Sequence, residues 1–273
     1  MSTFDTHLDS WAAYQTSPWG RIRYRVVAET IVRTCRTLGD GPLRVLDVGG
    51  GDGGDAGPLV AAGHDVTVVD PSAALLARAV AAGDGSPGNL RVVEATLDEL
   101  PTLGLGRFDL VVCHNLLQYL PDTATAVATL ADAVRPSGAL SLMSPNPPAE
   151  VLAAAIRRAD LAAATELLTA PVIRSETFEH DMRRIDADEA VAALATASFT
   201  DVTRYGIRCV TDFLADDERK AEPAFYAQLE SLELALCDRE PYVRTARFWQ
   251  LVARRPWSGR LEQAGSIRPG RRP

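Results

Sequence analysis

Acidic residues and glycines between positions 47 and 70 carry the clearest chemical signal in the sequence. A short, largely apolar run at 43–48 contains Asp47, and five glycines follow within the six positions 49–54. Such a loop can take up positive φ angles and lets the backbone approach a ligand, because no Cβ stands in the way. Asp70 ends the next apolar run, where nucleotide-binding α/β folds keep the carboxylate that holds two ribose hydroxyls. The pattern therefore predicts a ligand with a nucleoside part.

The charge of the loop bears on which ligand this is. Its glycines also match the G-x-G-x-x-G spacing of dinucleotide folds, but a pyrophosphate is best served by an uncharged helix N-terminus. Asp52 and Asp55 would repel phosphate and suit a cationic ligand. S-adenosylmethionine, with its ammonium and sulfonium groups, therefore fits better than a nicotinamide dinucleotide, and a purely structural glycine turn fits least. Asp55 is also placed to cap the short helix expected next.

The elements around the loop follow from the alternation of apolar runs and helical patterns along the 273 residues. Strand and helix alternate from residue 43 onward, which is typical of a parallel sheet with right-handed crossovers. We expect strands at 43–48, 64–69, 90–94, 108–113, 138–143, 201–210 and 245–254. We expect helices near 4–16, 21–38, 55–62, 72–82, 122–135, 188–199 and 229–236, with a break at 17–20. The predicted fold is a doubly wound, Rossmann-like α/β sheet of seven strands.

The same pattern of apolar runs and helices predicts how the chain is divided into parts. We expect an N-terminal helical lid at 1–39, a sheet domain at 40–255 and a disordered tail, rich in glycine and proline, at 256–273. Helical insertions are expected at about 145–187 and 211–241.

Composition limits the classes of function. The formal net charge of −8 argues against diffuse affinity for nucleic acid but allows a local basic face, and Lys220 is the only lysine among many arginines. No stretch approaches the ~18 apolar residues that a membrane span needs, and residues 1–10 do not look like a secretory signal. The four cysteines form no C-x-x-C pair, which indicates a reducing compartment and predicts a cytoplasmic protein. We expect no bound metal and no membrane partner.

The acid-then-glycine loop, the acid after the second strand and the two late strands resemble class I S-adenosylmethionine-dependent methyltransferases over roughly residues 40–255. This resemblance implies that the cofactor's methionine part would lie on the glycine loop, its ribose on the second acid and its adenine beside a pair before the fourth strand. The matching residues are Asp47, Gly49, Gly50, Gly51, Asp70, Leu97 and Asp98.

Several further segments are similar to the bacterial tRNA 5-carboxymethoxyuridine methyltransferases, which convert the carboxylate of a modified wobble uridine to a methyl ester. They are 20–23, 113–119, 141–143, 206–212, 229–230, 240–242 and Arg247. The resemblance implies that Arg23 would hold the cofactor's carboxylate and that His114 would lie beside its methionine part.

The chemistry of such a transfer makes few demands on side chains. A carboxylate nucleophile is already ionised near pH 7, so no general base is required, whereas a phenol or amine usually needs one. His114 is a possible base, which would favour a hydroxyl acceptor. Arg208 and Arg247 are the candidates to orient an acidic acceptor, with Tyr242 as a hydrogen-bond partner. For any single arginine, a surface ion pair is the commoner role.

The sequence thus favours an enzyme, an O-methyltransferase that esterifies a carboxylate, with 5-carboxymethoxyuridine of tRNA as the leading substrate. The tRNA phosphates would lie on arginines within 21–25, 157–158, 174–184 and 204–208. The alternative is carboxyl or hydroxyl methylation of a small metabolite or peptide, as in secondary metabolism. A non-catalytic binding subunit is a third reading, which the intact glycine loop and Asp70 oppose.

Overall fold

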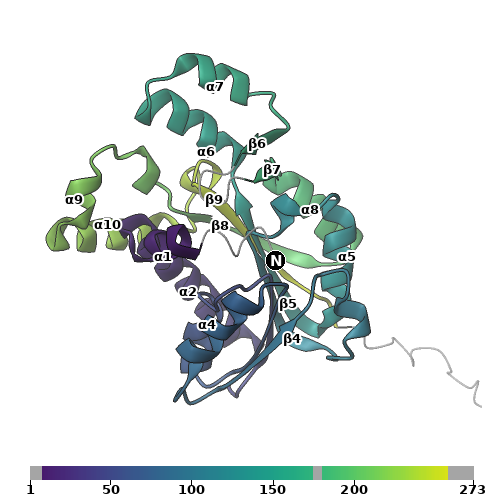
Figure 1. The fold of residues 1–273 in the computed structure, drawn as a ribbon. Helices are drawn as coiled ribbons and strands as arrows, with labels where there is room; N and C mark the ends of the chain where they lie inside the picture. Colours follow the sequence, from purple (N-terminus) through teal and green to yellow (C-terminus); the bar gives the residue numbers. More distant parts are fainter. Residues whose placement is uncertain (1–7, 175–179, 258–273) are drawn as a thin grey trace, which may run out of the picture.

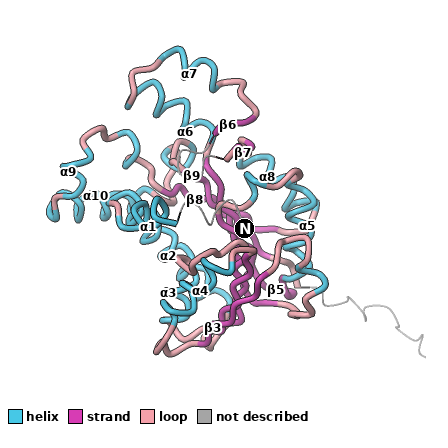
Figure 2. Tube along the Cα trace, viewed as in Figure 1, coloured by secondary structure: helices cyan, strands magenta, loops and turns pink. Residues whose placement is uncertain are grey.

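A seven-stranded sheet forms the centre of the computed structural model, which describes residues 8–174 and 180–257 (Figures 1 and 2). The strand order is β3-β2-β1-β4-β5-β9-β8, and β9 runs antiparallel to both β5 and β8. The strands are β1 (Arg44–Val48), β2 (Asp65–Asp70), β3 (Asn89–Glu94), β4 (Phe108–His114), β5 (Val134–Pro145), β8 (Thr200–Ile207) and β9 (Phe248–Arg254). This confirms the predicted doubly wound sheet of seven strands.

Helices cover both faces of the sheet, because a parallel sheet buries both of its faces. One core lies under α2 (Pro18–Leu38), α3 (Ala56–Ala61) and α4 (Ala73–Gly83). The other lies under α5 (Thr123–Ala133) and α8 (Ala187–Thr196), which stand side by side in Figure 1. Residues of β1 and β4 alternate between the two cores, so Val45 belongs to the core under α2 while Leu46 belongs to the core under α5.

Two insertions lie beyond the sheet. The first contains α6 (Pro147–Leu152), a π-helical turn (Ala153–Arg157), α7 (Leu161–Leu167) and a hairpin of β6 (Val172–Arg174) and β7 (Asp181–Arg183). The second contains α9 (Asp217–Ala221) and α10 (Pro223–Leu236), both of which contact α2. The first described helix, α1 (Leu8–Thr16), also packs against α2. Short 3₁₀ turns at Leu100–Thr102, Leu117–Tyr119, Thr211–Phe213 and Tyr242–Arg244 complete the described elements.

Several predicted boundaries were wrong. The break expected at 17–20 is confined to Ser17, whose hydroxyl accepts a hydrogen bond from the Gly20 amide at 3.0 Å and caps α2. Proline suits a first helical turn because its missing N–H has no partner there, so α2 begins at Pro18. Likewise β5 begins at Val134, inside the predicted helix, and β9 begins at Phe248. The expected tail falls almost wholly outside the described residues, as do residues 4–7 of the first predicted helix.

The N-terminal helices pack against each other through Gly20. A Cβ at this position would lie 1.9 Å from the backbone oxygen of Tyr14, so α1 and α2 can approach this closely only with glycine here. The contact matters for function, because α1 carries side chains to the glycine loop, as described below.

We expect Gly20→Ala to lower the free energy of unfolding by about 1–3 kcal/mol, because an added methyl group must push α1 away. Urea denaturation would measure the change. Gly57→Ala is the matched control: it lies in α3 with no atom within 4 Å of its added Cβ, and should be neutral or slightly stabilising. Equal effects of the two changes would contradict this account of the α1–α2 contact.

Candidate active site

A cavity of about 840 Å³ lies at the carboxyl ends of the central strands, where α/β sheets bind ligands. The loop after β1, the end of β2 and the end of β4 form one part of its wall, and further parts come from α1 and α2, the segment after β3, the first insertion and the residues beside β8 and β9. Among the predicted site residues, those that line it are Arg23, Asp47, Gly49, Gly50, Gly51, Asp70, Leu97, His114, Arg208 and Arg247. The structure places two others elsewhere: Asp98 is exposed outside the lining, and so is Tyr242.

The glycine loop has the predicted geometry. Gly49 and Gly51 have φ angles of 72° and 54°, in the region that favours glycine. A Cβ at Gly50 would lie 2.6 Å from the carboxylate of Asp47, so this glycine lets the loop fold over that side chain. The loop therefore brings backbone amides and a buried acid to the same wall of the cavity.

Asp47 fits a cationic ligand. Its side chain is 2% exposed, and its Oδ2 atom has no hydrogen-bond partner among the described residues. Burial, together with the negative charge of Asp55, raises the pKa of Asp47 well above its usual range. A buried carboxylate oxygen without a hydrogen-bond partner is unfavourable. An ammonium group of a ligand would supply both a hydrogen bond and a positive charge to this oxygen.

Asp70 is held by backbone amides at the end of β2. Its two carboxylate oxygens accept hydrogen bonds from Gly51 N at 3.0 Å and Ser72 N at 2.9 Å. Each carboxylate oxygen can accept more than one hydrogen bond, so these contacts orient the group and are compatible with the ribose contacts that the sequence predicts.

Asp55 does not cap α3, contrary to the prediction, because its carboxylate is used elsewhere. It forms a two-point ion pair with Arg23, whose Nη2 lies 2.8 Å from Oδ2, and it accepts a hydrogen bond from His114 Nδ1 at 2.8 Å. The other loop acid, Asp52, accepts hydrogen bonds from Trp11 and Gln15 of α1. Both acids are thus partnered by the N-terminal helices, so Asp47, rather than Asp52 or Asp55, is the loop acid that fits the cationic part of the ligand.

His114 is enclosed, with its side chain 2% exposed. Its Nε2 lies 2.8 Å from the hydroxyl of Ser141, so both ring nitrogens are engaged. Burial lowers the pKa of His114. Burial acts to raise the pKa of Asp55, but Arg23 and His114 outweigh it and hold that pKa well below the usual range. A neutral His114 therefore donates from Nδ1 to an ionised Asp55, and neither nitrogen is free to take a proton from an acceptor.

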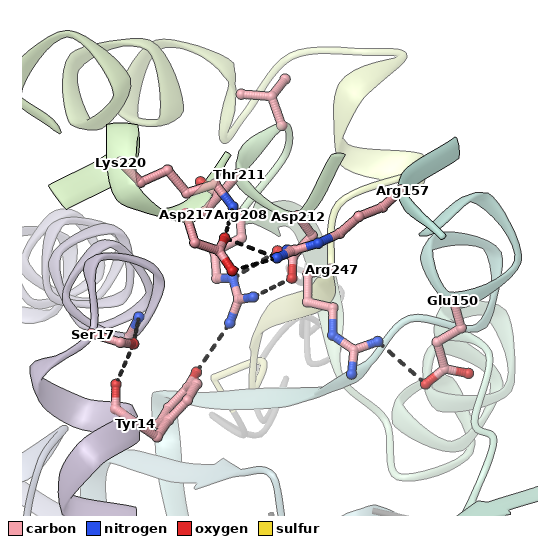
Figure 3. A network of polar contacts seen from close by, with 12 residues as sticks. Tyr14, Ser17, Glu150, Arg157, Arg208, Thr211, Asp212, Asp217, Lys220 and Arg247 are labelled. Atoms are coloured by element: carbon pink, nitrogen blue, oxygen red, sulfur yellow. Dashed lines mark hydrogen bonds and ion pairs between the residues drawn. The ribbon is translucent and has the colours of Figure 1, made fainter. Parts of the chain in front are cut away.

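Another part of the cavity is lined by five arginines, of which Figure 3 shows Arg157, Arg208 and Arg247. Arg157, Arg158 and Arg174 come from the first insertion, Arg208 directly follows β8, and Arg247 directly precedes β9. Arg157 binds Asp217 at 2.7 and 2.8 Å, and Arg208 forms a two-point pair with Asp212 and also reaches the Tyr14 hydroxyl. The remaining three are less tightly paired. Arg247 lies 3.5 Å from Glu150, exposed Arg174 lies 3.8 Å from exposed Asp181, and the side chain of exposed Arg158 has no ion pair or hydrogen bond among the described residues. The cavity is therefore acidic near the glycine loop and basic near the insertions.

Two arginines of the predicted phosphate-binding segment 174–184 have structural partners instead. Arg184 donates to the backbone oxygens of Pro147, Leu167 and Ala170 and to Glu150. Arg183 donates to Leu120 O, Thr123 and Glu189. Their charges tie the first insertion together, so the predicted segment is reduced to Arg174.

The sequence did not indicate Glu150 or the pairing of Asp55. Glu150 is 7% exposed, contacts Arg184 at 2.9 Å and lines the cavity. It follows a proline-rich stretch with no recognisable motif.

No group of three or more histidine, cysteine or acidic side chains in the described part of the chain could hold a metal ion. No helix in that part is long and apolar enough to cross a membrane.

The lowered pKa of His114 makes stability depend on pH. In the unfolded chain His114 takes up a proton below about pH 6.5, whereas in the folded protein it stays neutral to lower pH. Protonation therefore favours the unfolded chain, and stability is lost as pH falls through this range. In His114→Asn the amide can still donate to Asp55 but does not titrate. We expect the stability advantage of the native protein over this variant to shrink between pH 8 and 5.5 in urea denaturation. A constant difference would show that folding leaves the pKa of His114 unchanged.

Comparison with known proteins agrees with this geometry. Residues 45–138 match a family model described as a methyltransferase domain. The tRNA 5-carboxymethoxyuridine methyltransferase of Escherichia coli K12 is 28% identical over 244 residues, which cover 88% of this chain and 90% of that protein. A ubiquinone biosynthesis O-methyltransferase of Aromatoleum aromaticum is 36% identical over 103 residues, covering 38% of this chain and 44% of that protein.

Solved methyltransferases share the fold. A magnesium protoporphyrin IX methyltransferase from Synechocystis, with bound S-adenosylhomocysteine, has a TM-score of 0.59 at 17% identity and covers 92% of this chain and 94% of its own. A possible histamine N-methyltransferase from Thermotoga maritima has a TM-score of 0.58 at 14% identity, covering 93% and 98%. These structures show the class I fold. The matched methyltransferase domain and the Escherichia coli relative, together with the glycine loop and the acidic wall, identify an S-adenosylmethionine-dependent methyltransferase, an enzyme whose cofactor is S-adenosylmethionine.

Proposed function

We propose that this enzyme methylates a carboxylate oxygen to form a methyl ester, with 5-carboxymethoxyuridine at the tRNA wobble position as the leading acceptor. The observation that carries the proposal is the group of arginines that lines the cavity near the insertions. The similarity to the Escherichia coli enzyme supports the choice of acceptor, because it extends over most of both chains.

The residues at the acidic end divide the cofactor between them. Asp47 pairs with the ammonium group through its Oδ2, and Asp70 accepts from the ribose hydroxyls. Arg23 takes the carboxylate: Asp55 holds its two terminal nitrogens, and its buried Nε has no partner among the described residues. Leu97 borders adenine from the cavity wall. Bound S-adenosylmethionine supplies a methyl group on a sulfonium sulfur, and transfer breaks the C–S bond as that electron pair returns to sulfur.

Arg247 is the residue that orients the acceptor. Arg208 is fully engaged with Asp212, whereas Arg247 is 27% exposed and shares Glu150 with Arg184, which lies closer to that carboxylate. Its remaining N–H groups can hold an acceptor carboxylate by one oxygen. The second oxygen then attacks the methyl carbon and forms the new C–O bond. No proton leaves the acceptor, so the engagement of both His114 nitrogens is no obstacle.

The cofactor site can be tested by comparing two aspartates. We expect Asp70→Ala to weaken S-adenosylmethionine binding by about 1.5–3 kcal/mol in calorimetry, because hydrogen bonds to a charged group are lost. Asp98→Ala, which changes an exposed residue outside the cavity lining, is the matched control and should bind normally. Weaker binding in Asp98→Ala would support the predicted contact between Asp98 and adenine. Normal binding in Asp70→Ala would reject the proposed hydrogen bonds between Asp70 and the ribose hydroxyls.

The acceptor can be tested by the stability of the product. We expect tRNA carrying 5-carboxymethoxyuridine to take up radiolabel from the methyl donor, and mild alkali to release that label as methanol. Methyl groups on nitrogen or in an ether survive this treatment, so a product stable to alkali would rule out ester formation. Arg247→Met should reduce kcat/KM for this substrate, since it removes the charge that orients the carboxylate.

A small carboxylic acid is the second candidate, and the pairing of Arg157, Arg183, Arg184 and Arg208 favours it by leaving few charges for phosphate. Salt separates the two candidates. Binding through several phosphates weakens steeply between ~50 and ~200 mM salt, and Arg158→Gln with Arg174→Gln should flatten this slope. If tRNA binding ignores salt and both changes, the small acid is the acceptor class to pursue.

A further inference from the structure

A continuous chain of buried polar contacts begins at Arg23 and returns to the same helix two turns later. Its first part is the ion pair with Asp55, followed by the hydrogen bond between Asp55 and His114. Beyond His114 the chain passes through the hydroxyl of Ser141 on β5 and the amide of Gln250 on β9.

The return to α2 closes this circuit. Gln250 Nε2 donates to Ser141 Oγ at 3.0 Å, and Gln250 Oε1 lies 2.8 Å from the hydroxyl of Thr30. Thr30 stands seven residues after Arg23, on the same face of α2. The contacts thus span three adjacent strands, β4, β5 and β9, beneath one helix.

The hydrogen bonds run in one direction. Because Asp55 is ionised, the proton of His114 resides on Nδ1, and Nε2 must accept from the Ser141 hydroxyl. The Ser141 oxygen is then left to accept from the Gln250 amide. Each partner therefore fixes the orientation of the next, and the last group in the series is the Asp55 carboxylate that grips Arg23.

Thr30, Ser141 and Gln250 are completely buried, and none of them lines the cavity. Their neighbours on this face of the sheet are apolar, including Val112, Met143 and Phe248. Burying polar groups in such surroundings is favourable only when they satisfy one another, so an apolar core would have stabilised the fold as simply. The circuit does one thing that an apolar core cannot: it fixes the carboxylate that orients an arginine in the cavity wall.

We propose that Ser141 and Gln250 are positioning residues which, through His114 and Asp55, hold the guanidinium of Arg23 toward the carboxylate of the cofactor. This inference rests on the proposed role of Arg23 and is independent of the acceptor. It makes affinity for the cofactor's carboxylate depend on two residues that never touch the cofactor.

The test uses calorimetry on the full-length chain with S-adenosylmethionine and with decarboxylated S-adenosylmethionine, which keeps the ammonium and sulfonium groups. We expect Ser141→Ala to weaken binding of the first about five- to thirty-fold and to leave the second unchanged. Gln250→Met, which keeps the side-chain volume, should act in the same direction and carries the test if Ser141→Ala does not fold. An equal loss for both ligands, or no loss for either, overturns the proposal.

Two further variants calibrate the result. Ser144→Ala removes another fully buried hydroxyl of β5, which bonds Gln118 outside the circuit, and should leave the ratio of the two affinities unchanged. Arg23→Gln should abolish the preference for the carboxylate, and adding Ser141→Ala should then change the ratio no further. If Arg23→Gln retains the preference, the role of Arg23 and this inference both fail. If only Arg23→Gln loses it, the positioning circuit alone fails, and the proposed acceptor is untouched in either case.

Discussion

The ion pair between Arg23 and Asp55 is the interaction on which the arrangement of the site depends. Both side chains are nearly inaccessible to solvent, and such a pair is tolerated only where its geometry is good and further hydrogen bonds satisfy the charges. Here His114 supplies one of those bonds, and the position of His114 is set by β4. The pair joins α2 to the loop after β1, so α2 forms part of the cavity wall. The N-terminal region thereby contributes to the ligand site, although the ligand-binding pattern in the sequence begins only at β1.

The separation of charge across the cavity follows from the topology. Acids from the ends of β1 and β2 lie near the centre of the sheet, whereas arginines come from the insertion after β5, from the residue that follows β8 and from the residue that precedes β9. A donor with two cationic groups and an acceptor with a negative charge would be attracted to opposite ends of one space. This explains how an acidic protein, with a formal net charge of −8, can still present a basic acceptor site.

The insertion that carries part of the basic end is itself held by charge. Arg184 bridges the beginning of α6, the end of α7 and the buried carboxylate of Glu150, whose other neighbour is Arg247. An arginine can do this because its planar group offers five donors in fixed directions. The wall of the acceptor site and the side chain proposed to orient the acceptor thus share one carboxylate.

Local patterns along the chain were enough to predict the sheet, the glycine loop and the cofactor. These patterns are apolar runs of strand length, glycines that permit positive φ and an acid at a strand end. The resemblance to a known family added Arg23 and His114, which indeed lie in the cavity wall. The partners of charged residues were decided by the tertiary structure. By sequence alone Asp52 and Asp55 appeared available to a ligand, but in the structure they bind side chains from helices 30 to 40 residues away. Likewise Arg183, Arg184 and Arg208 appeared available to phosphate, but they bind backbone carbonyls and acidic side chains. The physical reason is that a pattern along the chain records which groups carry charge, whereas their free energy depends on distances and burial that only folding sets.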